Sequence, residues 1–181
     1  LQYAWGADRS SHLRAPAVLR NPYMYKVSKD ATTSLFGWGV QLSGTIKCCD
    51  WFRMFMNGVY GKGITPYIQD LTGSGLDFTP NPVDPTLVRM MPMWGVQAAG
   101  QINFPPRLFV SGGYSTVRVQ RSEGYYTADQ YKQGQYIFGN IFDSRTPRCK
   151  VAAEYLYGSR KDRNSMKNHA NRVNVMVQYN F

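Results

Sequence analysis

The chain has 181 residues, a formal net charge of +10 and a mean hydropathy of −0.40, with 18% charged and 14% aromatic residues. Soluble domains carry about 25% charged residues, so the chain is poor in charge and rich in aromatics for a soluble basic protein. The longest apolar runs fall short of the roughly 18 residues of a transmembrane helix, whereas membrane strands that alternate apolar and polar residues remain compatible with this composition.

Period-2 alternation predicts strands in the first half of the chain. Residues 1–5 already alternate like a strand and lack the basic and apolar regions of a secretory signal, so we expect the sequence to be a fragment. Residues 12–26 and 36–47 alternate more fully. In both runs the apolar side chains share one face, and the other face carries the cations Arg14, Arg20, Lys26 and Lys47.

The same alternation continues through residues 94–104, 150–158 and 172–181. In the last run Val173, Val175 and Val177 share the apolar face, which we expect to meet lipid. Parity places further cations on the polar face, with Glu154 as the main opposing charge: Arg53, Lys150 and Arg172. Residues 107–120 and 131–142 alternate less regularly, and a bulge that the sequence does not locate would account for this.

The connections between these runs predict a membrane topology. Short turn signals at 49–50, 104–107 and 143–147 alternate with longer segments at 28–33, 65–92, 121–130 and 161–168, which are rich in Gly, Pro, Asp and Ser. Outer-membrane barrels have short periplasmic turns and longer extracellular loops, so we expect the longer segments to be extracellular. Aromatic residues flank both sets of connections, as two interfacial belts would.

These patterns predict an all-β fold, an antiparallel transmembrane β-barrel, as one domain over residues 1–181. The runs number about eight strands, or nine with the opening stub, each near the 9 to 11 residues of a tilted membrane strand. A soluble β-sandwich alternates as well, but it has no reason to sort its loops by length or its aromatics to strand ends. Eight strands can close alone as a small barrel, or they can form part of a larger pore.

Several strings of residues resemble the C-terminal half of DcaP-like outer-membrane porins. They are YKQGQYIFGNIF (131–142), TP (146–147) with VAAEYLYG (151–158), NHANRVNVMVQYNF (168–181), SHLRAP (11–16), GWGVQ (37–41) and GITPYIQD (63–70). The resemblance implies part of a larger, homotrimeric barrel in the outer membrane of Gram-negative bacteria, whose basic lumen passes small anionic solutes such as carboxylates. Three cysteines depart from what barrel strands would carry, and we assign no role to Cys48, Cys49 and Cys149.

Parity and resemblance together give candidate functional residues. We expect a pore lining that binds anions, formed by Arg14, Arg20, Lys26, Lys47, Arg53, Lys150 and Arg172. Arg20 falls near mid-depth on its strand and is the expected main contributor to anion selectivity. The terminal Tyr179 and Phe181 resemble the signal by which barrel-assembly machinery recognises its clients, and Phe181 can also end an aromatic belt.

Other functions fit the sequence less well. Only His12 and His169 are available as a histidine general base, at opposite ends of their strands and without a G-x-S-x-G motif, so we expect neither an enzyme nor a cofactor. The cations are spread over the whole chain without a nucleic-acid-binding motif, so we expect no nucleic-acid partner. A small closed barrel acting as an adhesin or structural anchor is the alternative function.

Two further segments carry charges of interest. Asp70, Asp77 and Asp84 lie in the segment 65–92, but their spacing matches no calcium-binding pattern. We expect no metal there, and a loop that folds over or into the pore mouth. Four cations in or beside the segment 161–168 either meet the phosphates of lipopolysaccharide or are merely solvated: Arg160, Lys161, Arg163 and Lys167.

Overall fold

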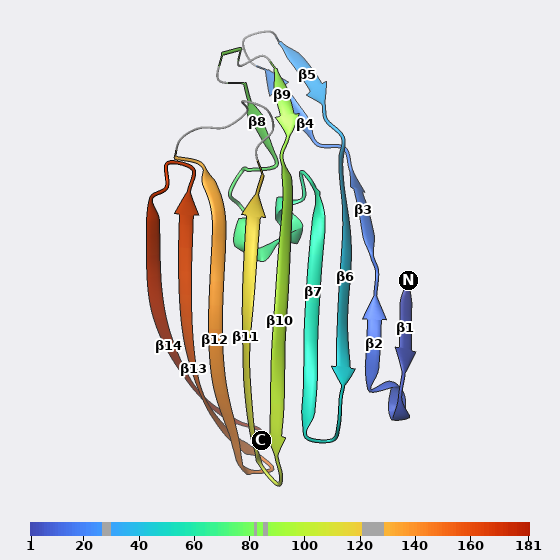
Figure 1. Cartoon of the computed structure of the whole chain (residues 1–181), viewed down its shortest axis with the longest axis vertical. Coiled ribbons are helices and arrows are strands. Elements are labelled where there is room, and N and C mark those ends of the chain that lie inside the picture. Colours follow the sequence, from blue (N-terminus) through green and yellow to red (C-terminus); the bar gives the residue numbers. More distant parts are fainter. Residues whose placement is uncertain (27–29, 82, 85–86, 121–128) are drawn as a thin grey trace.

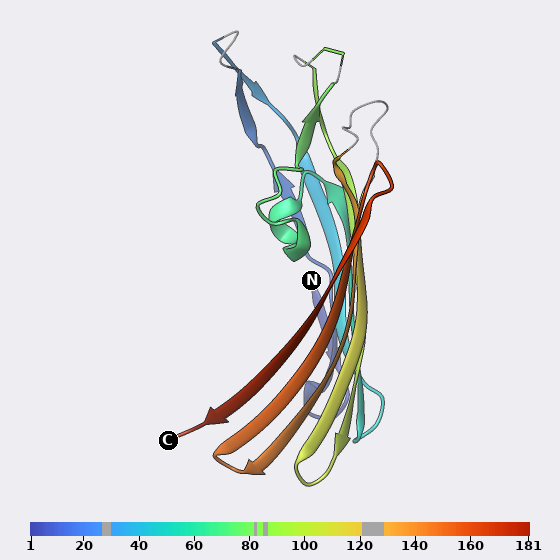
Figure 2. The same ribbon diagram turned by 90° about the vertical axis from the view of Figure 1, so that its left-hand side faces the viewer.

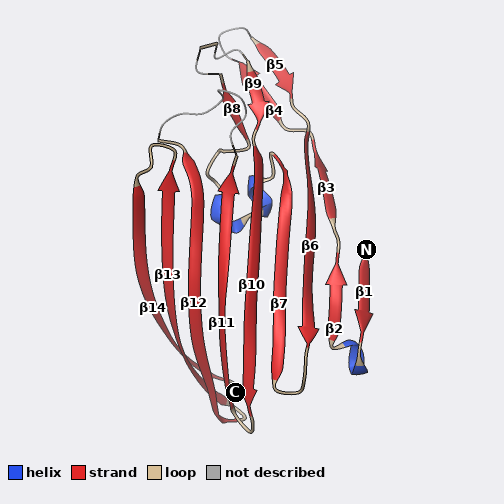
Figure 3. Cartoon of the chain, viewed as in Figure 1, coloured by secondary structure: helices blue, strands red, loops and turns tan. Residues whose placement is uncertain are grey.

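The computed structural model describes residues 1–26, 30–81, 83–84, 87–120 and 129–181. Antiparallel strands dominate it, and the helical segments are single 3-10 turns (Figures 1 and 3). In the described residues, no helix is long and apolar enough to cross a membrane. The strands are β1 (Gln2–Trp5), β2 (Ser11–Arg14), β3 (Ala17–Arg20), β4 (Tyr23–Lys26), β5 (Ala31–Ser34), β6 (Gly37–Lys47), β7 (Phe52–Lys62), β8 (Phe78–Pro80), β9 (Val88–Met90), β10 (Pro92–Phe104), β11 (Leu108–Val119), β12 (Tyr131–Thr146), β13 (Cys149–Asp162) and β14 (Lys167–Tyr179).

One sheet contains most of these strands, in the order β1-β2-β6-β7-β10-β11-β12-β13-β14, with β3 also paired to β6. β2 and β3 are two parts of one strand, because His12 pairs with Thr45 and Ala17 with Val40 in a single register. Pro16, which has no N–H to donate, interrupts that strand. The sheet thus has nine strand positions, which confirms the prediction of nine strands that includes the opening stub.

The sheet is strongly curved and has a concave and a convex face (Figure 2). Its two outermost strands, β1 and β14, do not pair with each other in the described part of the chain. The chain therefore does not close on itself as a small barrel. Between the two possibilities that the sequence left open, the structure has the form of part of a larger barrel wall.

Strand register sorts the side chains between the two faces, because directly paired residues of an antiparallel ladder lie on the same face. The convex face carries exposed apolar side chains across many strands, among them Val40, Leu42, Val96, Ile137, Ile141, Tyr155 and Val175. Monomeric soluble proteins rarely expose apolar surface so extensively. The predicted alternation is confirmed for residues 36–47, 94–104 and 150–158. Of the longer predicted runs 12–26 and 172–181, residues 12–20 and 172–179 alternate in the sheet, whereas β4 belongs to a separate hairpin.

The hydrophobic core lies on the concave face, where the connection between β7 and β10 folds back onto the sheet (Figure 2). This segment, which we call the inner loop (residues 63–91), contains the turns η3 (Thr65–Tyr67) and η4 (Gln69–Leu71) and the hairpin β8–β9. Its Ile64 and Leu71 are fully buried, as are Met93 and Val119 on the strands. Each such side chain contributes about 1.5 to 3 kcal/mol, so the expected inward fold of this loop is confirmed and strongly stabilised.

One predicted connection was wrong in length, and another contains a hairpin that was not predicted. Strands β13 and β14 continue to Asp162 and from Lys167, so only residues 163–166 connect them, closed by a hydrogen bond from Asp162 N to Met166 O (3.0 Å). Residues 31–33 belong to β5, which pairs with β4 and extends the β3–β6 hairpin beyond the sheet (Figure 1). Of the predicted loop 121–130, residues 121–128 lie outside the described part of the chain. Among the predicted long connections, the β13–β14 turn is therefore the one that the described residues show to be short.

Two strands explain the irregular alternation. The ladder of β12 and β13 shifts register between Tyr131 and Gln133 and again between Ser144 and Thr146, so the expected bulges lie at the ends of β12. In β11 the register is continuous, and the apolar residues that disturb its pattern lie on the concave face. Phe109 stacks there on Phe142, with ring centroids 4.5 Å apart, so Phe142 does not join the predicted aromatic belt on the membrane face.

Candidate functional site

Arg20 fastens the inner loop to the wall. Its guanidinium group forms an ion pair with Asp77 (3.0 Å) and donates a hydrogen bond to the carbonyl oxygen of Gly63. Asp77 also accepts a hydrogen bond from the backbone N–H of Thr65 (2.9 Å). The side chains of Arg20 and Asp77 are 22% and 17% exposed, so this pair is largely shielded from water. The charge that sequence parity placed on the concave face is present, but Asp77 compensates it.

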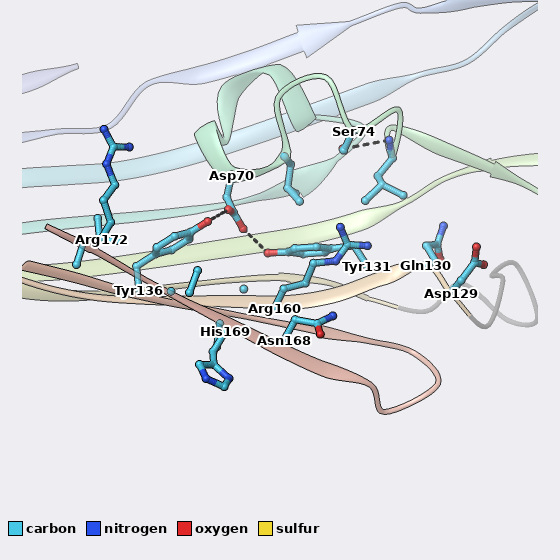
Figure 4. Close-up of a pocket in the computed structure, with 17 residues that line it drawn as sticks. Asp70, Ser74, Asp129, Gln130, Tyr131, Tyr136, Arg160, Asn168, His169 and Arg172 are labelled. Carbon is cyan, nitrogen blue, oxygen red and sulfur yellow. Dashed lines mark hydrogen bonds between the residues drawn. The ribbon is translucent and has the colours of Figure 1, made fainter. Parts of the chain in front are cut away.

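A second carboxylate fastens the other side of the inner loop. Asp70 accepts hydrogen bonds from the phenolic hydroxyls of Tyr131 and Tyr136, both on β12 (Figure 4). The guanidinium carbon of Arg160 lies 5.5 Å from the ring centroid of Tyr131, and its Nε forms an ion pair with Asp162 (2.8 Å). The inner loop is thus tied to β3 through Asp77 and to β12 through Asp70, with its apolar side chains packed between.

A cavity of about 780 Å³ opens between the inner loop and strands β12 to β14. Asp70, Leu71 and Leu76 line it on the loop side, and Tyr131, Tyr136, Arg160 and Arg172 line it on the strand side (Figure 4). Figure 4 also places the His169 side chain on the opposite side of the sheet from Asp70. The lining has mixed charge, because the carboxylates of Asp70 and Asp129 share it with the guanidinium groups of Arg160 and Arg172.

Most of the remaining predicted pore cations lie on the concave face by register. Arg14 pairs with Ser43, Lys47 with Arg53, Arg53 with Gln101, Lys150 with Ser144, and Arg172 with Leu156. Arg14 donates a hydrogen bond to Gln2 (3.1 Å) and Arg172 to Asn174 (2.8 Å). In the described part of the chain, no carboxylate forms an ion pair with Arg14, Arg53, Lys150 or Arg172.

Two predicted pore residues differ from this set. Lys47 forms an ion pair with Asp50 in the adjacent turn (2.6 Å), and this hydrogen-bonded partner lowers the pKa of the Asp50 carboxyl. Lys26 belongs to β4 and pairs with Ala31, and its side chain lies outside the described part of the structure. The opposing carboxylate, Glu154, shares the concave face and accepts a hydrogen bond from Asn174 (2.8 Å).

The structure separates the cations near the β13–β14 turn into two groups. Arg163 donates hydrogen bonds to Gln130 (3.0 Å) and to the carbonyl oxygens of Val119 (3.1 Å) and Gln120 (3.0 Å). Arg160 pairs with Asp162 on the cavity side. Arg163 thus links the β13–β14 turn to the end of β11, and Arg160 contacts the Tyr131 ring on β12. The sequence had grouped both arginines with Lys161 and Lys167 as surface cations.

Sequence reasoning missed Tyr131 and Tyr136 and the separate uses of Asp70 and Asp77. A phenol on the polar face of a strand was the available signal at Tyr136, but its carboxylate partner lies 66 residues away in the chain.

His12 lies on the concave face, paired with Thr45, whereas His169 lies on the convex face and stacks on Tyr157. These histidines cannot meet in one site. No group of metal-ligating side chains occurs among the described residues.

The curved, open antiparallel sheet, its apolar convex face and the loop packed against its concave face define the class of structure: part of the wall of a transmembrane β-barrel. The chain is similar to the crystal structure of the outer membrane channel DcaP of Acinetobacter baumannii, with a TM-score of 0.81 and 21% sequence identity. The match covers 97% of this chain and 49% of the channel, so the chain spans about half the length of that protein. No family model and no curated protein sequence matches the chain. The barrel-wall fold expected from the sequence resemblance is confirmed.

Proposed function

We propose that this chain forms about half of the wall of an outer-membrane channel, and that small hydrophilic solutes diffuse along its concave face. The observation that carries the proposal is the division of the sheet into an apolar exposed convex face and a polar, cationic concave face with a loop folded onto it. Lipid-facing and lumen-facing residues alternate in this way in outer-membrane barrels. The inner loop would then narrow the passage.

We further propose that the channel prefers anions such as small carboxylates. Four cations support this preference, because they share the concave face and have no carboxylate ion-pair partner among the described residues: Arg14, Arg53, Lys150 and Arg172. A basic lining lowers the energy of an anion in a pore and raises that of a cation. Arg20, which the sequence made the main contributor, is paired with Asp77 and is better explained as the anchor of the inner loop.

Reversal potentials in a salt gradient across a planar bilayer test both parts of the proposal. We expect discrete conductance steps with anion preference, and a clear loss of that preference in the double variant Arg53→Gln/Arg172→Gln. The matched control is Arg9→Gln/Arg148→Gln, which removes two cations outside the sheet's concave face and should leave the preference unchanged. A protein that inserts without conducting would contradict the channel, and cation preference in the unmodified protein would contradict the selectivity.

The proposed channel function also implies a cellular location, an oligomeric state and an assembly partner for the protein. The fold supports insertion in the outer membrane of a Gram-negative bacterium, and the sequence resemblance supports assembly as a homotrimer. Tyr179 and Phe181, whose rings lie 5.2 Å apart in an edge contact at the chain end, suit recognition by barrel-assembly machinery during insertion. Deleting Phe181 should reduce the inserted fraction in cells, and unchanged insertion would leave Phe181 as an interfacial aromatic residue.

The alternative function, a small closed barrel acting as an adhesin or anchor, is less well supported. It requires β1 and β14 to pair, and in the described residues they form the two open edges of the sheet. An adhesin with a filled interior would also give no conductance in the bilayer experiment, so the same measurement separates the two functions.

A further inference from the structure

A row of cations crosses the convex face at the end of the sheet where the inner loop emerges. Arg118 on β11 pairs with Gln133 on β12, Gln133 pairs with Lys161 on β13, and Lys161 pairs with Lys167 on β14. Paired residues share a face, and the same parity carries exposed Ile137 and Tyr155 on the convex side. Adjacent strands lie about 4.8 Å apart, so the convex cation row (Arg118, Lys161 and Lys167) spans about 15 Å.

The convex cation row has no compensating anion among the described residues. In the described part of the chain, no side-chain hydrogen bond or ion pair involves Arg118, Lys161 or Lys167. Lys161 and Lys167 stand directly opposite each other on neighbouring strands. Like charges in that position destabilise a sheet, so this arrangement costs folding free energy unless an anion lies between the two ammonium groups.

The residues next to the row place it at a membrane interface. One residue pair further into the sheet, the convex face carries Gln135, Ser159 and His169, which are polar. The pair after that carries Tyr157, which stacks on His169 with ring centroids 6.2 Å apart, and Tyr114, which accepts a hydrogen bond from Gln135 (2.7 Å). Tyrosines with one polar and one apolar side are typical of the headgroup boundary. The cation row therefore lies just outside the acyl region, at the level of lipid phosphates.

We propose that Arg118, Lys161 and Lys167 form a binding site for the phosphate groups of an outer-leaflet lipid headgroup, which in an outer membrane are those of lipopolysaccharide. A guanidinium group can hold a phosphate through two parallel hydrogen bonds, and two ammonium groups add point charges. A phosphate between Lys161 and Lys167 also removes their mutual repulsion. The inference rests on the proposed outer-membrane location, because only that location brings this lipid to the convex face.

Lipid retention by the purified protein tests the site. The protein in detergent micelles is mixed with diphosphoryl lipid A, and bound lipid is counted by native mass spectrometry. We expect Lys161→Gln/Lys167→Gln to weaken the affinity for lipid A on the order of tenfold or more. Each basic residue near an anionic membrane surface raises the affinity about fivefold, and this variant lacks two. The control Arg9→Gln/Arg148→Gln removes the same charge and should retain lipid A like the unmodified protein.

Two further arms identify the source of the phosphate. Lipid A from which the phosphates have been removed should bind the unmodified protein as weakly as diphosphoryl lipid A binds the Lys161→Gln/Lys167→Gln variant. Inorganic phosphate at the same concentration should not displace lipid A. Displacement by inorganic phosphate would overturn the assignment to a lipid, and equal retention by the double variant and its control would overturn the site.

Lys167→Glu provides a test that does not depend on a loss of folding. An ion pair with Lys161 would replace the repulsion, so the variant should resist urea better than the unmodified protein in lipid-free detergent while retaining less lipid A. Lower stability together with unchanged retention would contradict the inference. Conductance measured on the same preparations distinguishes the lipid site from the channel function. If Lys161→Gln/Lys167→Gln conducts and retains lipid A normally, the lipid site is refuted and the channel function is not affected.

Discussion

At the scale of single residues, the sequence predicted which face a side chain occupies better than it predicted what that side chain does. Period-2 alternation placed Arg20 on the polar face correctly, because one face of each strand is apolar throughout. Its partner Asp77 lies 57 residues away in a segment without strand periodicity, and no local pattern links the two. Charges on a polar face are therefore predictable, whereas their compensation depends on how the inner loop packs.

The Arg20–Asp77 ion pair should stabilise the fold. In Asp77→Asn a largely shielded guanidinium group loses its counter-charge, and the Thr65 N–H is left with a neutral amide oxygen as acceptor in place of a carboxylate. A fully buried pair costs about 3 to 5 kcal/mol when one partner is removed, so partial exposure lowers the expected loss to on the order of 2 kcal/mol. The measurement is the free energy of unfolding in urea, followed by circular dichroism in detergent.

A matched control removes the same charge elsewhere. Asp50→Asn breaks the pair with Lys47, in which the Asp50 side chain is 96% exposed, and should not change the unfolding midpoint measurably. Equal losses in the two variants would indicate a general charge effect, and no loss in Asp77→Asn would mean that the Gly63 carbonyl and the Tyr67 ring hold Arg20 without a counter-charge.

The Asp70 contacts should control the width of the passage more than the stability of the fold. Tyr131→Phe/Tyr136→Phe leaves the apolar packing of Ile64 and Leu71 in place but removes both hydrogen bonds to Asp70, each of which contributes about 1.5 to 3 kcal/mol when the acceptor is charged. We expect the inner loop to detach from β12 part of the time. Single-channel records should then show larger and noisier current levels, while Tyr114→Phe, on the opposite face, should leave the current unchanged.

At the scale of elements, regular strands were predictable and connections were not. Strands β6, β10, β13 and β14 follow the alternation because their two faces meet different surroundings. Strand β11 did not, because Val117 and Val119 are apolar on the concave face, where the inner loop covers them. A tertiary contact of this kind makes the concave face apolar locally, and no bulge is required. The turn at residues 163–166 was predicted too long because polar residues at the ends of β13 and β14 resemble a loop in composition.

The last strand offers a direct comparison of the two faces. Val175 lies on the convex face, and an arginine on a lipid-facing strand position near the bilayer midplane costs about 2 to 4 kcal/mol. Asn174 lies on the concave face beside Glu154, so Asn174→Arg gains an ion-pair partner instead. We expect Val175→Arg to lower the inserted fraction and the urea midpoint, and Asn174→Arg to preserve both. Equal effects at the two positions would mean that the faces of β14 are reversed.

At the scale of the whole molecule, the orientation in the membrane remains a prediction. One of the four connections that the sequence expected to be long, between β13 and β14, is short, so the argument from loop length rests on the β4–β5 hairpin, the inner loop and the segment between β11 and β12. The proposed lipid site at the convex cation row agrees with the same orientation, because phosphate-rich lipid occupies the outer leaflet. Both arguments place the β13–β14 turn outside the cell and the β6–β7 turn, which contains Cys48, in the periplasm.

The natural cysteines make this orientation testable in whole cells. Cys48 and Cys49 lie in the β6–β7 turn and Cys149 begins β13, so all three lie at the end of the sheet that we expect to face the periplasm. A polymer-linked maleimide too large to pass the channel should therefore leave the protein unlabelled in intact cells and label the exposed Cys48 once the outer membrane is opened. In a variant with serine at the three natural cysteines, Asn164→Cys in the β13–β14 turn should be labelled in intact cells, whereas Asp50→Cys should not. Labelling with the reverse pattern would invert the topology, and with it the assignment of the convex cation row to the outer leaflet.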